Sequence, residues 1–166
     1  MAAHELYLVR HGLAAEPGPS FESDAERPLT PEGVSRMKQE AAALGELEIA
    51  FDVILTSPLV RARQTADALA AQLKPKPPVI EVEALAPGSP ATAVARELAA
   101  HRKASRIALV GHEPGIGELA ARLIGARQPV PFKKGAICCI EVDTLPPKGP
   151  GVLRWFATPR MLRRMG

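Results

Sequence analysis

The chain has 166 residues, 46% hydrophobic and 23% charged, which is the composition of a globular protein with one domain and one core. Its formal net charge of +3 is too small to indicate a nucleic-acid-binding protein. The apolar run at 6–9 is too short for a signal sequence and no stretch approaches the ~20 apolar residues of a membrane span, so we expect a cytoplasmic protein without membrane contact.

Short apolar runs separated by helical patterns indicate an α/β fold. Buried strands are predicted at 5–9, 52–55, 79–82, 106–110, 136–142 and 152–156. Alternation of strands with helices predicts a three-layer sandwich with a mostly parallel central sheet flanked by helices, in a single domain over 1–166. The last two strands are joined by a turn at 146–151 and are expected to add an antiparallel edge.

Three helices share one predicted start signal, a hydroxyl residue followed by proline. The pairs are Thr30-Pro31, Ser57-Pro58 and Ser89-Pro90, in which the hydroxyl would cap the helix and proline would take its first position. Apolar residues then recur at steps of three and four. A fourth helix is predicted to begin at Pro114.

The remaining segments lack strong periodicity. The long irregular stretch 13–29 leaves directly from the first predicted strand, so we expect it to form a wall of any site at that strand end. Cys138 and Cys139 are adjacent and would point to opposite faces of a strand, as small apolar residues. The basic segment 160–165 is interpreted as a solvated tail or helix end, with contact to a membrane or an acidic partner as the less favoured alternative.

Two histidines follow predicted buried strands. His11 lies in Arg10-His11-Gly12 after the first strand, and His112 lies in Gly111-His112-Glu113 after the strand at 106–110. In an open parallel sheet the carboxyl ends of the strands form the ligand-binding edge, so the two side chains are expected to converge there.

Two arginines are expected to join the histidines. Arg61 falls in the first turn of the helix after Ser57, and Arg27 falls in the long irregular stretch. Guanidinium groups and helix N-termini both favour phosphate oxygens, so the pattern predicts a phosphate site with imidazole chemistry.

The three motifs together resemble the histidine phosphatase superfamily, also known as the phosphoglycerate mutase-like fold. They are Arg10-His11-Gly12, the segment from Ser57 to Ala66 (SPLVRARQTA) and Gly111-His112-Glu113, in the order that the family has them. The short length and the segment Arg27-Pro28-Leu29-Thr30-Pro31-Glu32-Gly33 are most similar to the small bacterial SixA-like branch. Members of that branch remove phosphate from phosphohistidine on signalling proteins.

The resemblance implies a role for each matching residue. His11 would be the nucleophile that holds the phosphoryl group, and His112 would donate a hydrogen bond to that group. Arg10 and Arg61 would bind the non-bridging oxygens, with Arg27 as a further phosphate contact. Gly12 would permit the tight turn that aims the His11 ring. The resemblance implies no metal and no other cofactor.

The proton donor is the least defined part of the predicted site. Many family members use Glu or Asp to protonate the leaving group, and Glu83, at the end of the strand at 79–82, is the candidate here. The SixA-like branch also acts without a clear equivalent. Ser57 is interpreted as a helix cap rather than a ligand, Arg63 as a solvated helix residue, and Glu113 as either a cap or part of the pocket wall.

The leading functional hypothesis is a phosphatase that acts on phosphohistidine of a protein. Only about 22 residues separate Glu83 from the strand at 106, so little chain remains to cover the site. The alternative is a phosphatase of small phosphate esters. A mutase is less favoured because it needs an enclosed pocket, and a non-catalytic phosphate-binding module is less favoured because both histidines and both arginines are present.

Overall fold

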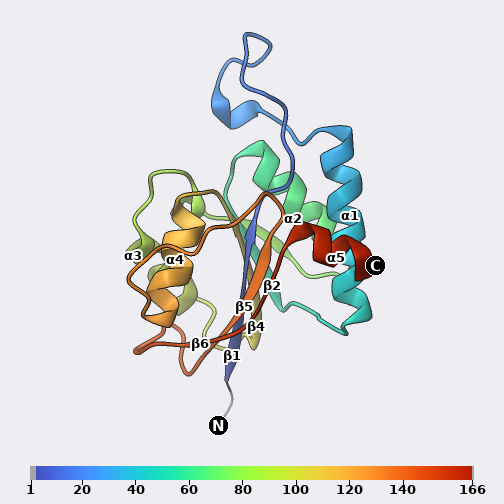
Figure 1. The fold of residues 1–166 in the computed structure, drawn as a ribbon. Coiled ribbons are helices and arrows are strands. Elements are labelled where there is room, and N and C mark those ends of the chain that lie inside the picture. Colours follow the sequence, from blue (N-terminus) through green and yellow to red (C-terminus); the bar gives the residue numbers. More distant parts are fainter. Residues whose placement is uncertain (1–2, 166) are drawn as a thin grey trace.

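The computed structural model describes residues 3–165, which form a sheet between two layers of helices (Figure 1). The strands are β1 (His4–Arg10), β2 (Val53–Thr56), β3 (Val79–Glu81), β4 (Arg106–Gly111), β5 (Ile137–Val142) and β6 (Val152–Ala157). Their order in the sheet is β3-β2-β4-β1-β5-β6. The first four in this order pair in parallel, and β5 and β6 pair antiparallel, which confirms the predicted fold class and its antiparallel edge.

The helices divide between the two faces of the sheet. They are α1 (Pro31–Glu46), α2 (Val60–Gln72), α3 (Ala91–Ala99), α4 (Gly115–Ile124) and α5 (Pro159–Met165), with short 3-10 turns η1 (Asp24–Glu26) and η2 (Glu83–Leu85). Helices α1, α2 and α5 cover one face, and α3 and α4 cover the other (Figure 1). Because strand side chains alternate, Tyr7 and Val9 of β1 enter one core while Leu6 and Leu8 enter the other.

The helix starts agree only partly with the predicted signal. The hydroxyl of Thr30 accepts a hydrogen bond from the Gly33 amide at 2.9 Å, which confirms that cap. The other two caps are wrong. Helix α2 begins at Val60, because Ser57 continues the line of β2 and is fully buried. Helix α3 begins at Ala91, because the Ser89 hydroxyl donates to the Glu83 carbonyl instead.

The basic C-terminal segment forms a helix that packs on the core through one buried side chain. Residues 159–165 form α5, whose Leu162 is buried in the core beside α1 and α2. Cys138 and Cys139 are buried free thiols in β5, as predicted. Within residues 3–165, no helix combines the length and the apolar character that crossing a bilayer requires.

Candidate active site

The carboxyl ends of β1, β2 and β4 meet at one edge of the sheet. The register aligns Arg10 with Gly111 and Thr56 with Val110, so the residues that follow each strand are neighbours. The amide of His11 donates to the Gly111 carbonyl at 3.0 Å. The rings of His11 and His112 lie with their centroids 5.0 Å apart, so the structure brings the two predicted histidines together.

His11 is held in one tautomer by its own backbone. Its Nδ1 lies 2.8 Å from the carbonyl oxygen of Gly12. A carbonyl only accepts, so Nδ1 carries the hydrogen and Nε2 keeps a free lone pair. The pKa of His11 is lowered to about 3, chiefly by burial; the neighbouring His112, Arg61 and Arg10 also lower it, and the hydrogen bond to the Gly12 carbonyl opposes them. The ring is therefore neutral at neutral pH and can act as a nucleophile.

His112 is likewise buried and neutral. Burial and then the charge of Arg61 lower its pKa to about 4. Its Nε2 lies 2.8 Å from the Ser57 hydroxyl oxygen, and its Nδ1 has no hydrogen-bond partner within residues 3–165. When the Ser57 hydroxyl donates to Nε2, Nδ1 carries the proton and is a free donor. Sequence reasoning assigned Ser57 to a helix cap and missed this contact with the imidazole.

The buried Arg61 and the half-buried Arg10 are both anchored at terminal nitrogens. Arg61 donates from Nη1 to the carbonyl of Asp24 and from Nη2 to its carboxylate, each at 2.8 Å. Arg10 donates from Nη1 to the carbonyl of Phe132 at 2.8 Å. In both, Nε is buried without a partner among the described residues. Unpaired buried donors are costly, and an anion placed against them would satisfy them.

The long irregular stretch closes one side of this site. An isolated antiparallel β-bridge between Ala14 and Leu29 holds the two ends of this stretch together. Asp24 accepts from Arg27 Nε at 2.8 Å as well as from Arg61, and these bonds hold the pKa of the Asp24 carboxyl below its ordinary value. Arg27 also donates to the Ala15 carbonyl at 2.6 Å. The stretch therefore forms a wall, and Asp24 links its arginine to that of α2.

A cavity of about 400 Å³ lies between these groups, and we call it the basic cavity. The residues that line it are Arg10, His11, Ala14, Glu16, Pro17, Asp24, Arg27, Arg61, Pro87, His112, Glu113 and Lys134. Lys134 and Asp24 are additions that no sequence motif marked. Glu83, the predicted proton donor, is not part of this lining. It begins η2, where its side chain is exposed.

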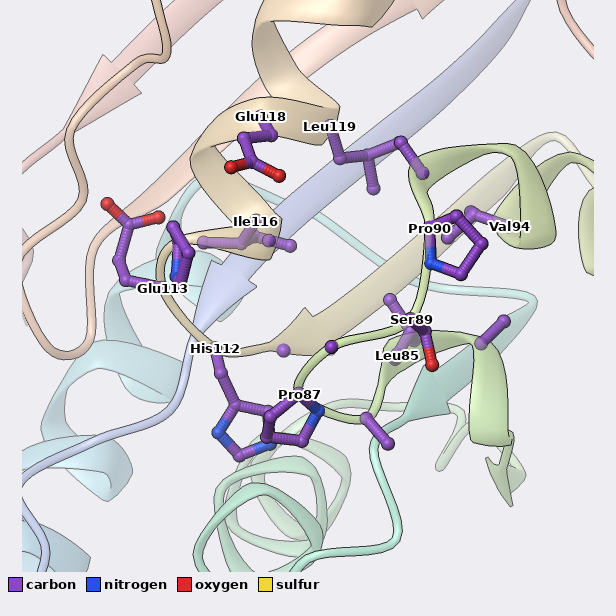
Figure 2. Close-up of a pocket in the computed structure, with 17 residues that line it drawn as sticks. Leu85, Pro87, Ser89, Pro90, Val94, His112, Glu113, Ile116, Glu118 and Leu119 are labelled. Atoms are coloured by element: carbon purple, nitrogen blue, oxygen red, sulfur yellow. The ribbon is translucent and has the colours of Figure 1, made fainter.

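A second cavity of about 260 Å³ adjoins the basic cavity (Figure 2). The two share Pro87, His112 and Glu113. The second cavity lies between the segment 84–91 and the start of α4, where apolar side chains gather: Leu85, Val94, Ile116 and Leu119. The site thus pairs a cationic compartment with an apolar one.

Gly12 is required for a different reason from the one the sequence suggested. It is not among the glycines with positive φ, which are Gly88, Gly125 and Gly135. A Cβ at Gly12 would lie 2.8 Å from Cγ of the buried Met37, so a larger residue would collide with α1. The Gly12 amide also donates to the Thr65 hydroxyl at 3.0 Å, which ties the loop after β1 to α2.

Comparison with known proteins gives consistent matches. Residues 6–86 match the family model of the histidine phosphatase superfamily (branch 1). An uncharacterized protein of Picosynechococcus is 44% identical over 119 residues, which is 70% of each chain. The phosphohistidine phosphatase SixA of Escherichia coli is 27% identical over 161 residues, 96% of each chain. A structure of the protein histidine phosphatase SixA complexed with tungstate superposes with a TM-score of 0.84 at 26% identity, and the match covers 94% of this chain and 97% of that one.

Proposed function

Since the chain belongs to the histidine phosphatase superfamily and is a hydrolytic phosphatase of the SixA-like kind, we propose that it removes phosphate from phosphohistidine on a signalling protein. The observation that carries this proposal is that Arg10, Arg61 and His112 line one cavity of about 400 Å³ together with the neutral His11. The related SixA structure was determined with tungstate, a tetrahedral oxyanion like phosphate. We place the reaction in the cytoplasm.

The first step is transfer of the phosphoryl group to His11. The Nε2 lone pair attacks phosphorus in line with the bond to the leaving group, an N–P bond forms, and the bond to the leaving nitrogen or oxygen breaks. The hydrogen on Nδ1 stays bonded to the Gly12 carbonyl, which holds the ring as its other nitrogen becomes bonded to phosphorus. Water then attacks phosphorus and the N–P bond to His11 breaks; the proton of the water leaves with inorganic phosphate, and the Nε2 lone pair of neutral His11 is restored.

The cations stabilise the charge on the non-bridging oxygens during both steps. Arg10, Arg61 and Arg27 contribute guanidinium charge from the lining of the basic cavity, and His112 donates from Nδ1. These groups are held before substrate arrives by the Phe132 carbonyl, Asp24 and the Ser57 hydroxyl. The proposed chemistry uses no metal and no cofactor.

The leaving group is the point at which the substrate classes differ. Glu83 remains the sequence candidate for a proton donor, and its exposed position outside the basic cavity argues against direct transfer. A leaving imidazole nitrogen is protonated readily, whereas an alkoxide needs an acid. A phosphoramidate such as phosphohistidine therefore needs a positioned acid less than a phosphate ester does.

The mechanism is tested with His11→Ala and with His101→Ala as a control. His101 follows α3 at the start of β4, the opposite end of the sheet from the basic cavity. We expect His11→Ala to abolish hydrolysis of an aryl phosphate, and wild type to carry acid-labile phosphate when quenched during turnover. His101→Ala should behave like wild type. Full activity in His11→Ala would refute the covalent mechanism.

The second cavity, beside His112, supports a second candidate function, the hydrolysis of a small phosphate ester. Its 260 Å³ beside His112 offers space for an uncharged leaving group. The two candidates are separated by kcat/KM for a phosphohistidine-bearing protein against a panel of small phosphate esters. A higher value for the protein supports the leading proposal, and a higher value for one ester supports the alternative.

A further inference from the structure

Glu113 connects two segments of backbone at the edge of the basic cavity. Its Oε1 accepts from the Gly117 amide in the first turn of α4 at 2.8 Å, and its Oε2 accepts from the Phe132 amide at 3.2 Å. Figure 2 shows this carboxylate on the side of α4 away from Pro87 and Ser89. Glu113 therefore uses both oxygens as acceptors for backbone N–H groups.

The approach of these segments requires glycine at 117. A Cβ at that position would collide with the Val130 carbonyl and would lie 2.8 Å from Oε1 of Glu113. The Val130 amide also donates to the Gly117 carbonyl at 3.1 Å. The segment 130–132 is thus bound to α4 at two points, one of which is the Glu113 carboxylate.

The same segment holds Arg10. The Phe132 residue whose amide donates to Glu113 offers its carbonyl to Arg10 Nη1 at 2.8 Å. The Phe132 ring is buried and packs edge-on against Phe156, with centroids 5.0 Å apart. Phe132 is therefore fixed by its amide and by its ring, and Arg10 is fixed by Phe132.

Arg10 depends on this anchor because its guanidinium is otherwise weakly held. Burial lowers the pKa of Arg10 below its ordinary value, and the carboxylate of Glu113 opposes that effect. Among the described residues, the Arg10 side chain donates to the Phe132 carbonyl, and Nε of Arg10 has no partner. A shift of the 130–132 segment would turn the guanidinium within the basic cavity.

We propose that Glu113 is a positioning residue that holds Arg10 in its phosphate-binding orientation through the backbone of Phe132. It is not the proton donor, because both of its oxygens accept from backbone N–H groups. The role rests on the proposed function in one respect only, namely that Arg10 binds the phosphoryl group.

Glu113→Gln tests this role with little change in shape. The amide keeps one acceptor oxygen and presents an NH₂ group to the second backbone N–H, so one of the two contacts is lost. We expect kcat/KM for an aryl phosphate to fall about tenfold, mainly through KM, and the inhibition constants of vanadate and inorganic phosphate to rise by a similar factor. Glu97→Gln on α3 makes the same chemical change outside both cavities and should alter neither.

Two readouts separate positioning from other roles. If Glu113 were the proton donor, the loss would be much greater for phenyl phosphate, a poor leaving group, than for 4-nitrophenyl phosphate. A positioning role lowers both alike. If Glu113 only stabilised the fold, Tm would fall while KM and the vanadate inhibition constant stayed unchanged. Either of these results overturns the proposal.

A double variant links the effect to Arg10. The double variant Arg10→Ala/Glu113→Gln should bind phosphate almost as well as Arg10→Ala alone, because the guanidinium that Glu113 positions is already absent. Fully additive losses would contradict the role. If wild type hydrolyses neither ester nor a phosphohistidine-bearing protein, the proposed phosphatase activity fails, and binding of inorganic phosphate measured by calorimetry still tests Glu113.

Discussion

Glu40 provides a sharp test of the electrostatics behind the active-site loop. It lies in α1, its side chain is 1% exposed, and its Oε2 has no hydrogen-bond partner among the described residues. Its Oε1 lies 3.9 Å from Arg163 of α5, and a Cβ at Gly135 would lie 2.7 Å from it. Gly135 in turn donates to the carbonyls of Arg10 and His11. The carboxyl group is therefore buried directly behind the turn that carries His11, the proposed nucleophile.

Burial dominates the ionisation of this group. It raises the pKa of Glu40 from the ordinary 4.5 to about 8, against the opposing charges of Arg163 and Arg36. The folded protein thus keeps a proton that the unfolded chain has lost. The contribution of Glu40 to the free energy of unfolding is therefore greatest below about pH 4.5, and it decreases as the pH rises from 4.5 to about 8.

The histidines of the active site change stability in the opposite direction. The pKa values of His11 and His112 are lowered to about 3 and about 4, so these neutral side chains destabilise the fold increasingly as pH falls below 6.5. The pH dependence of stability that Glu40 causes and the one that the two histidines cause overlap between about pH 4.5 and pH 6.5. Comparison of wild type with Glu40→Gln removes the histidine contribution, because both chains carry it.

The expected magnitude follows from the two ionisation constants of Glu40. Between about pH 5 and about pH 8, the free energy of unfolding of Glu40→Gln should rise by about 3 to 4 kcal/mol relative to wild type. Urea unfolding at a series of pH values measures this difference. Glu46→Gln, an exposed position at the end of the same helix, should track wild type. Parallel profiles for wild type and Glu40→Gln would refute the reasoning.

Two further predictions concern the basic cavity. Asp24→Ala removes the carboxylate that binds Arg61 and Arg27 but keeps the Asp24 backbone carbonyl, so KM for an aryl phosphate should rise about three- to tenfold. Asp67→Ala, which breaks the exposed pair with Arg63, should leave KM unchanged, and an equal rise in both would contradict the anchoring role of Asp24. Because His11 and His112 have pKa values of about 3 and about 4, kcat/KM corrected for ionisation of the ester should show no inflection near the ordinary histidine pKa of 6.5. An inflection there would show that one of the rings is protonated in the free enzyme.

Some residues of the proposed phosphatase site are marked by the sequence around them, and others are not. His11, His112 and Arg61 were found because each follows a buried strand or opens a helix, where the geometry of a parallel sheet fixes position. Asp24, Phe132 and Lys134 carry no such signal. Asp24 and Lys134 line the cavity and Phe132 binds Arg10 from outside its lining, and the paths of their segments are set by contacts with distant residues rather than by their own periodicity.

The same division explains the errors. Ser57 matched a helix-cap pattern, yet it directly follows β2, its amide donates to the Val110 carbonyl of β4 at 3.0 Å, and this buried contact overrides the local preference. Glu83 ends an apolar run, yet η2 exposes it outside the cavity. The basic C-terminal segment, predicted as a solvated tail or helix end, is a helix whose Leu162 packs beside α1 and α2.

The amino-acid sequence by itself determined the α/β architecture and the pair of strand-end histidines, because apolar periodicity and the parallel arrangement fix both without reference to loops. Only the tertiary structure decided how those histidines stay neutral and how the arginines are aimed. Burial lowers the imidazole pKa values, and the anchors of the guanidiniums, Asp24 and the Phe132 carbonyl, lie 37 and 122 residues away along the chain. Contacts over such separations form only when the whole domain is folded.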